Sequence, residues 1–259
     1  MKAMILAAGL GTRLRPLTDA RPKALVEMAG STLLEITLSR LRLFGISDVI
    51  INVHHYAEMI LEYLRTNDNF GMRIAVSRED VLLDTGGGLK KAAWFFDSVK
   101  DEPFIVHNVD VISTIDLGRM VQFHVQNDAL ATLAVKDRQA SRYLLFDEQL
   151  RLCGRRIGRD QTPELVRSSE PVEELAFSGI HVISPRLLRM MTEKGSFSII
   201  TCYLRLARLG EKILAFRTDK SYWCDLGRPE HVAQAAEDLR LGRMNSDRVS
   251  SMKESNNAS

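Results

Sequence analysis

The sequence predicts an α/β fold, a doubly wound and mostly parallel Rossmann-like sheet with helices on both faces. Short, nearly continuous apolar runs alternate with longer segments whose apolar residues have helical spacing. Strands that are apolar on both faces are typical of a parallel sheet that helices cover on both sides. The chain has 259 residues, of which 45% are hydrophobic, and this length and composition suit one large domain with a sizeable core.

The alternation continues through the first half of the chain, to about residue 135. A short apolar run comes first, and β-branched runs such as "DVIINV" then stand between amphipathic segments. The predicted strands are 4–8, 48–53, 72–77, 103–110 and 129–135, and the predicted helices are 32–45, 56–67, 88–96 and 117–127. This order is typical of parallel strands joined by helical crossovers.

The pattern changes at residue 136. Short runs such as "SRYLLF" and "LAFSGIHVI" stand between polar loops, which predicts a small antiparallel subregion over 136–183. Residues 184–242 return to the core, with helices expected at 185–193, 200–210 and 229–242 and strands at 212–217 and 221–227. Pro229 and Gly242 stand where a helix would begin and end. We expect a single domain over 1–242, made of 1–135, 136–183 and 184–242, and a disordered tail over the polar, aromatic-free residues 243–259.

The overall charge and the cysteine content exclude several classes of protein. A formal net charge of +2 is too small for a nucleic-acid surface or a polybasic membrane arm. The apolar run at 4–8 is short for a secretory signal, and no run approaches the roughly 18 residues of a membrane helix. Cys153, Cys202 and Cys224 form no C-x-x-C pair, which favours a reducing compartment. We expect a cytoplasmic protein that binds neither nucleic acid nor membranes, while its oligomeric state stays unknown.

A glycine turn directly after the first strand predicts a nucleotide site. Gly9 and Gly11 lack side chains at the strand end where open α/β sheets bind ligands, so backbone N–H groups there can approach a phosphate or a base. No Walker loop is present, and Leu14 stands where the dinucleotide fingerprint requires its third glycine. Arg13 and Lys23 add a fork-shaped and a point-like cation, which favours a triphosphate as the ligand.

Two aspartates stand at the ends of predicted strands. Asp110 ends the apolar run "FIVHNVD", and Asp225 follows "YWC" ahead of a helix. Mg²⁺ takes oxygen ligands and usually relies on one or two carboxylates together with substrate phosphates. The sequence therefore predicts Mg²⁺ as a cofactor, with Asp110 and Asp225 as its ligands.

The segment "AAGLGTRLRPLTDARPKAL", residues 7–25, resembles the signature G-x-G-T-R-(x)-P-x-T…P-K of the sugar-1-phosphate nucleotidyltransferases. The resemblance extends to about Gly242. It implies Mg²⁺-dependent transfer of a nucleotidyl group from a nucleoside triphosphate to a sugar 1-phosphate, with release of pyrophosphate. It assigns Arg13 and Lys23 to catalysis at the phosphates. The residues that it implies at the nucleotide are Ala8, Gly9, Gly11, Thr12, Arg13, Gly86, Gly87 and Asn108.

The resemblance is weaker where the sugar would bind. "EELAFSGIHVIS" is similar to the family's sugar-pocket strand and implicates Glu174, Ser178 and Gly179. The Glu-Lys-Pro motif with which many members bind the sugar phosphate is absent. Arg155 or Arg156 of "RLCGRRIG" is a candidate replacement.

Within the family, the short chain, "TGGGLKKA", "FSGIHVI" and the missing Glu-Lys-Pro motif most resemble the members that transfer uridylyl groups from UTP to N-acetylmuramate 1-phosphate. Mannose-1-phosphate guanylyltransferases are the nearest alternative. A catalytically silent nucleotide-sugar sensor is an alternative of a different class. Such a sensor is expected to lose Arg13, Lys23, Asp110 or Asp225, and all four are present.

Overall fold

The computed structural model describes residues 1–97, 101–158, 161–169 and 171–244. Within these residues, one sheet contains ten strands, which are β1 (Lys2–Leu6), β4 (Asp48–Val53), β5 (Arg73–Arg78), β6 (Phe104–Asn108), β8 (Ala131–Lys136), β9 (Arg142–Phe146), β10 (Leu152–Ile157), β11 (Glu164–Leu165), β12 (Glu173–Ile183) and β13 (Ile213–Arg217). Outside this sheet, β2 (Glu27–Met28) pairs with β3 (Ser31–Thr32), and β7 (Val111–Ser113) pairs with β14 (Trp223–Asp225). The helices are α1 (Leu33–Leu43), α2 (Ala57–Thr66), α3 (Asp84–Lys91), α4 (Leu117–Gln126), α5 (Arg186–Met190), α6 (Ile199–Arg208) and α7 (Pro229–Arg240).

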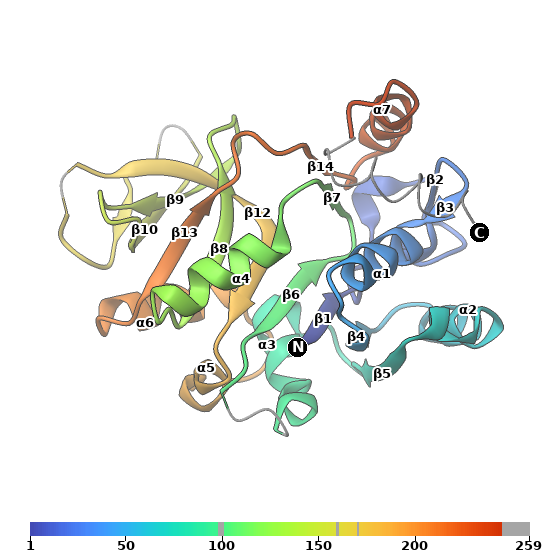
Figure 1. The fold of residues 1–259 in the computed structure, drawn as a ribbon, viewed down its shortest axis with the longest axis horizontal. Coiled ribbons are helices and arrows are strands. Elements are labelled where there is room, and N and C mark those ends of the chain that lie inside the picture. The colour runs from blue at the N-terminus through green and yellow to red at the C-terminus, as the bar shows by residue number, and fades with distance from the viewer. Residues whose placement is uncertain (98–100, 159–160, 170, 245–259) are drawn as a thin grey trace, which may run out of the picture.

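The strand order of the sheet reverses at β1 (Figure 1). β1 lies between β4 and β6 and is parallel to both, and β5 extends the sheet beyond β4. β12 then pairs antiparallel with β6, while β8 joins through β12 and is paired in parallel with β13. Ligands of open α/β sheets bind in the crevice where the strand order reverses, which here lies between the carboxyl ends of β1 and β6.

Helices cover both faces of the sheet (Figure 1). Ala3 and Ile5 of β1 belong to the core that α1, α2, α4 and α7 cover, whereas Met4 belongs to the core under α3, α5 and α6. All three side chains are fully buried, as expected for a central strand of a parallel sheet. The predicted fold class is confirmed.

Local residue choices explain where several helices begin and end. The Thr32 side chain accepts a hydrogen bond from the Glu35 amide at 3.1 Å and caps α1, and Asp116 caps α4 by accepting from the Arg119 amide at 3.0 Å. Each cap satisfies a backbone N–H that has no partner within the helix. Pro229 starts α7, as its fixed φ favours.

Several predicted elements differ from the structure in extent. β1 ends at Leu6, because the Ala7 amide donates to Asn52 Oδ1 at 2.7 Å instead of continuing the ladder. α3 begins at Asp84, before the predicted start at 88, because its glycines pack within the helix against other segments. The strand predicted over 103–110 stops at Asn108, and β7 begins separately at Val111.

The predicted subregion at 136–183 is antiparallel and shares a strand with the main sheet. β9 pairs antiparallel with β10, and β10 pairs antiparallel with β11. Residues 173–175 of β12 pair with β9, whereas residues 180–183 pair with β6, and the register against β8 shifts between Phe177 and His181. Gly179 lies in this shift with a φ of 74°, a conformation that favours glycine. The division into 1–135, 136–183 and 184–242 stays a prediction, and residues 245–259 of the predicted tail lie outside the described residues.

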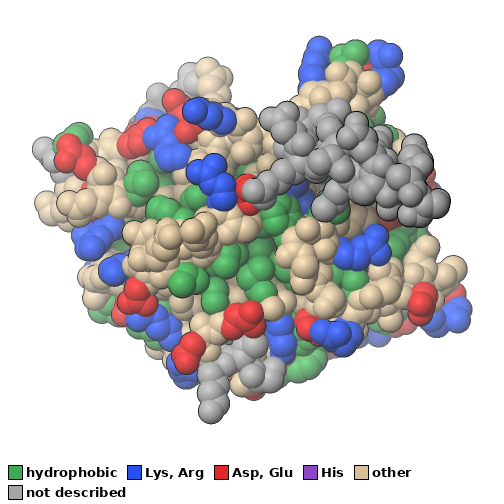
Figure 2. All heavy atoms as spheres, in the orientation of Figure 1, with side chains coloured by type: hydrophobic (Ala, Val, Ile, Leu, Met, Phe, Trp, Pro, Cys, Tyr) green, Lys and Arg blue, Asp and Glu red, His purple; other side chains and the backbone are tan. Residues whose placement is uncertain are grey.

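The face drawn in Figure 2 carries basic and acidic side chains interspersed with each other. In the described part of the chain, every helix falls short of the length and apolar content that crossing a membrane requires.

Candidate active site

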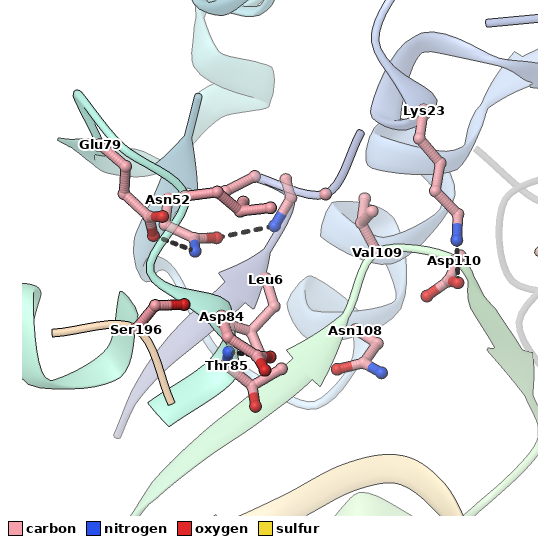
Figure 3. Close-up of a pocket in the computed structure, with 14 residues that line it drawn as sticks. Leu6, Lys23, Asn52, Glu79, Asp84, Thr85, Asn108, Val109, Asp110 and Ser196 are labelled. Atoms are coloured by element: carbon pink, nitrogen blue, oxygen red, sulfur yellow. Dashed lines mark hydrogen bonds and ion pairs between the residues drawn. The ribbon is translucent and has the colours of Figure 1, made fainter. Parts of the chain in front are cut away.

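A pocket of about 350 Å³ lies at the carboxyl ends of β1 and β6 (Figure 3). Its walls come from the segments that follow β1, β5 and β6. The lining residues are Leu6, Ala7, Ala8, Gly9, Lys23, Asn52, Glu79, Leu82, Asp84, Thr85, Asn108, Val109, Asp110 and Ser196. The pocket therefore brings together five of the predicted site residues, Ala8, Gly9, Lys23, Asn108 and Asp110, in the crevice that the sheet order predicts.

The glycine loop presents backbone to this pocket. Gly9 is exposed, and a Cβ there would meet no atom within 4 Å. Gly11 has a φ of 67°, and a Cβ there would lie 2.9 Å from Thr18 Cγ2 and 3.2 Å from Lys23 Cβ. Thr18 also donates from Oγ1 to the Gly11 carbonyl at 2.9 Å. Glycine at position 11 thus allows both the turn and its close packing on the segment that carries Lys23.

Thr12 and Arg13 lie on a 3₁₀ turn, Thr12–Leu14, and are exposed outside the pocket lining. The Arg13 guanidinium reaches the segment after β14. A Cβ at Gly227 would lie 3.0 Å from Arg13 Nη2 and 2.6 Å from Asp225 Oδ1. Arg13 and Asp225 therefore meet at Gly227.

Lys23 and Asp110 form an ion pair at the pocket (Figure 3). Lys23 Nζ donates to Asp110 Oδ2, and the two side chains are 13% and 14% exposed. Charges this poorly hydrated are tolerated because each has a partner. The cation predicted to bind phosphate is thus in contact with a carboxylate predicted to bind Mg²⁺.

The paired strands β7 and β14 bring Asp225 to the same edge. Asp225 pairs in register with Val111, and the Leu226 amide donates to the Asp110 carbonyl at 2.7 Å. Asp225 Oδ1 accepts from the Gly227 amide at 2.7 Å, whereas Oδ2 has no hydrogen bond or ion pair within the described residues. Two carboxylates at one edge fit Mg²⁺, since substrate phosphates and water usually supply its other ligands.

The opposite wall contains a buried pair, Asn52 and Glu79, that sequence reasoning missed (Figure 3). Glu79 is 3% exposed, its Oε1 accepts from Asn52 Nδ2 at 2.7 Å, and its Oε2 accepts from the Leu83 amide at 2.9 Å. Asn52 Oδ1 accepts from the Ala7 amide at 2.7 Å. The pair therefore fixes the loop after β1 to the loop after β5. The signal that could have found it is a polar residue near the end of each of two apolar strands.

Gly86 and Gly87, predicted to contact the base, lie within α3 and outside the pocket lining. A Cβ at 86 would clash with the Phe197 ring, and one at 87 would lie 2.6 Å from the Gly195 carbonyl oxygen. Both amides donate to the Phe197 carbonyl, at 2.9 and 3.3 Å. Packing between α3 and the segment before α6 thus explains both glycines, and their contact with a base stays a prediction.

Of the predicted sugar-binding residues, Gly179 adjoins the pocket without lining it, and Ser178 contacts β14. A Cβ at Gly179 would lie 2.9 Å from Asn108 Nδ2, so β12 touches a lining residue there. The Ser178 carbonyl accepts from Trp223 Nε1 at 2.8 Å. The strand predicted to bind the sugar is therefore connected both to the pocket and to β14, which carries Asp225.

The third predicted sugar-binding residue, Glu174, forms an ion pair with Arg156. Arg155 instead pairs with Glu164 of β11 at 2.7 Å. Of the two arginines considered as replacements for the missing lysine, Arg156 is the one in contact with a predicted sugar-binding residue.

A histidine and a cysteine next to the site are uncharged near neutral pH. Burial lowers the pKa of His107 from 6.5 to about 4, and the charge on Arg40 acts in the same direction. His107 Nδ1 lies 2.7 Å from the Asn108 carbonyl oxygen. Burial likewise raises the pKa of the Cys224 thiol to about 11. The charges at the site are therefore those of its lysine, its arginines and its carboxylates.

Comparison with known proteins identifies the family. A family model described as nucleotidyl transferase matches residues 2–241. The chain belongs to the nucleotidyl transferase family. Over 251 residues, this nucleotidyl transferase is 32% identical to the N-acetylmuramate alpha-1-phosphate uridylyltransferase of Caulobacter vibrioides, and the match covers 92% of this chain and 96% of that protein. The family predicted from the glycine-loop signature is confirmed.

Three further matches have lower sequence identity. A mannose-1-phosphate guanyltransferase of Yarrowia lipolytica is 30% identical over 236 residues, which cover 89% of this chain and 61% of that protein. The structure of HddC from Yersinia pseudotuberculosis in complex with GMP-PN matches with a TM-score of 0.72 at 22% identity, over 92% of this chain and 99% of that one. A UDP-glucose pyrophosphorylase complexed with UDP-glucose has a TM-score of 0.74 at 16% identity, over 92% and 98% of the two chains. These two structures show that the fold is shared.

Proposed function

We propose that this nucleotidyl transferase catalyses the Mg²⁺-dependent transfer of a uridylyl group from UTP to N-acetylmuramate 1-phosphate, which gives a UDP-sugar and pyrophosphate. The observation that carries the proposal is the Lys23–Asp110 pair beside the glycine loop, in the crevice between β1 and β6. The choice of base and sugar is supported by the relative from Caulobacter vibrioides, which matches over nearly the whole length of both chains.

The proposed reaction forms one phosphorus–oxygen bond and breaks another. A phosphate oxygen of the acceptor attacks the α-phosphorus of UTP, and the bond from that phosphorus to the oxygen bridging to the β-phosphate breaks as pyrophosphate leaves. A phosphate monoester has a second pKa near 6, so the nucleophile is already ionised and needs no general base. The obstacle is the approach of two anions, which positioning and charge neutralisation overcome.

The charged side chains have separate roles in this scheme. Lys23 donates to the phosphate oxygens where bonds change, and Arg13 holds the leaving pyrophosphate with its planar fork. Asp110 and Asp225 would hold Mg²⁺, and the charge of the ion would stabilise the negative charge on the phosphates. We assign the remaining contacts with the nucleotide to Ala8, Gly9, Gly11, Thr12, Gly86, Gly87 and Asn108, and those with the acceptor to Glu174, Ser178 and Gly179.

A second candidate is transfer of a guanylyl group to mannose 1-phosphate. It is supported by the Yarrowia lipolytica relative, although this chain spans 61% of that protein's length. Both candidates use the same phosphate chemistry, so they differ in the contacts to base and sugar. A silent sensor of nucleotide sugars is the third candidate, against which the presence of Arg13, Lys23, Asp110 and Asp225 argues.

The test is a matrix of pyrophosphate-release assays with Mg²⁺. UTP, GTP, CTP and dTTP are each combined with the 1-phosphates of N-acetylmuramate, mannose, glucose and N-acetylglucosamine. We expect the highest kcat/KM for UTP with N-acetylmuramate 1-phosphate, and loss of turnover when EDTA removes Mg²⁺. The highest value for GTP with mannose 1-phosphate would support the second candidate. No turnover anywhere, with nucleotide binding still measurable by calorimetry, would support the sensor.

A further inference from the structure

Arg138 follows β8 and is held in a fixed position by two contacts. Its guanidinium carbon lies 3.9 Å from the centroid of the Trp223 ring, and Nη2 donates to the Phe177 carbonyl at 3.0 Å. Nη1 lies 3.5 Å from the Gln139 carbonyl oxygen, at the limit of a hydrogen bond. Stacking of a guanidinium on an indole fixes its plane. Each terminal nitrogen carries two N–H groups, so Nη1 and Nη2 each keep one beyond the carbonyl that it contacts.

The charge of Arg138 lacks the partner that other arginines nearby have. Arg156 pairs with Glu174 and Arg155 with Glu164, whereas no carboxylate lies within 4.0 Å of the Arg138 nitrogens among the residues that the structure describes. Its Nε is buried and has no hydrogen-bond partner in the same set. Burial lowers the pKa of Arg138, and the charge on Asp225 opposes this shift. A half-buried guanidinium without a carboxylate partner is costly, and an anionic ligand would remove that cost.

Arg138 lies between the segment that carries Asp225 and the strand that is predicted to bind the sugar. Trp223, on which it stacks, is in β14 with Asp225, and Trp223 Nε1 donates to the Ser178 carbonyl at 2.8 Å. Phe177, whose carbonyl holds Nη2, precedes Ser178 and Gly179 in β12. Arg138 is therefore attached both to the segment that carries a predicted Mg²⁺ ligand and to the strand predicted to bind the sugar.

We propose that Arg138 binds an anionic group of the acceptor. The proposal rests on the proposed function, because Arg138 lies outside the pocket lining and contacts the strand that is proposed to bind the acceptor. The anion is a tetrahedral phosphate or a planar carboxylate, and the guanidinium fork recognises either through paired N–H···O bonds. In the first case the group is the 1-phosphate, which every acceptor carries. In the second case it is a carboxylate on the sugar, and Arg138 then selects acidic sugars.

The first experiment measures the binding of anionic ligands near Arg138 without turnover. Trp94→Phe leaves Trp223 as the single tryptophan, since the chain has two, and Trp94 is 55% exposed. The full-length variant, with Mg²⁺ and a non-hydrolysable UTP analogue, is titrated with glucose 1-phosphate and with N-acetylmuramate. The first probe offers only the phosphate and the second only the carboxylate. We expect one of them to change Trp223 emission saturably, and Arg138→Gln to abolish that change.

The control is Arg142→Gln, which removes the same charge from an exposed arginine of β9. It should leave the titration unchanged. In steady-state assays, Arg138→Gln should raise the KM for the acceptor about tenfold or more, with the KM for UTP within about twofold, and Arg138→Lys should recover only part of the loss because the fork is absent. A purely structural role would instead alter both KM values together.

The outcomes separate this proposal from the proposed function. Saturable binding that depends on Arg138, without any turnover in the wild-type assay, would support the role of Arg138 and contradict the transferase. Turnover by the wild type, with neither probe changing Trp223 emission or with the change persisting in Arg138→Gln, would overturn the role of Arg138 and leave the transferase in place.

Discussion

Asp110 and Lys23 depend on each other for charge compensation in a poorly hydrated place. Their side chains are 14% and 13% exposed, and Lys23 Nζ donates to the carboxylate. Asp110→Asn keeps the shape of the side chain but removes the charge that offsets the lysine and that the proposed Mg²⁺ site requires. We expect kcat to fall by about 100-fold or more, since a preorganised charge at the reacting phosphates is lost. Steady-state assays at saturating Mg²⁺ measure this, with circular dichroism as the check on folding.

The matched control for this variant is Asp128→Asn. The Asp128 side chain is 83% exposed, and asparagine tolerates its φ of 47°. Its kinetics should be those of the wild type. If Asp110→Asn also kept wild-type turnover, Asp110 would not be a Mg²⁺ ligand.

The three glycines of α3 pack the helix against neighbouring segments. Alanine is favoured over glycine in a helix interior by about 1 kcal/mol, but a Cβ at Gly87 would lie 2.6 Å from the Gly195 carbonyl oxygen. We therefore expect Gly87→Ala to lower the free energy of unfolding by about 1–3 kcal/mol, because overpacking outweighs the gain in propensity. Urea denaturation measures the change.

The same substitution at Gly118 of α4 serves as the comparison. Gly118 is exposed, and the nearest atom to its Cβ would be Asp116 Oδ1, at the end of a side chain, at 3.2 Å. Gly118→Ala should change stability less than Gly87→Ala. An equal or larger loss at Gly118 would mean that crowding against residue 195 does not explain glycine at position 87.

α3 also shows where prediction from the sequence ends. The main strands follow from apolar runs, and helices such as α1, α2 and α4 from spacing, because burial imposes those periods locally. "DTGGG" is typical of a turn, since glycine disfavours helix. The helix forms there because Gly86 and Gly87 fit against Phe197 and Gly195, residues more than a hundred positions away. No local sequence pattern indicates a contact between residues so far apart in the chain.

The residues of the candidate site likewise divide into those that the sequence predicts and those that it does not. Gly9, Lys23 and Asp110 could be predicted because a motif of fixed spacing contains the first two and a strand end presents the third. Glu79 and Arg138 could not, because their roles arise from contacts between strands that are distant in sequence. Glu79 matters through Asn52 of β4, and Arg138 through Trp223 of β14.

Over the whole molecule, three buried histidines couple stability to pH. Burial lowers the pKa of His107 and His124 from 6.5 to about 4 and that of His181 to about 3. Below about pH 6.5 the unfolded chain binds protons that the folded protein refuses, so stability is lost as the pH falls from about 6.5 toward 4. We expect a loss on the order of 1–2 kcal/mol for each histidine between about pH 7 and about pH 5. Urea denaturation at these pH values measures it.

A histidine variant identifies the source of this dependence. His124 is 2% exposed, and its two ring nitrogens contact Thr132 and Ser184. His124→Asn should reduce the loss of stability between about pH 7 and about pH 5 by the amount expected for one histidine, about 1–2 kcal/mol. His55→Asn, at an exposed position, should leave the loss unchanged. A loss that is the same in both variants would assign the pH dependence to other groups.

Strand β12, which pairs with both β9 and β6, limits how acceptor specificity can be exchanged between relatives. Its first residues pair with β9 and its last with β6, and Gly179 takes up the register shift between them with a positive φ. A chimera that imports residues 136–183 whole would replace the part of β12 that pairs with β6. It would therefore alter the packing against Asn108 of the candidate pocket along with the residues predicted to bind the sugar. The workable splice point lies within the strand, between Phe177 and Ile180, with the glycine retained. We therefore expect that acceptor specificity can be exchanged between relatives only by substituting side chains on β12, while the backbone of that strand is kept.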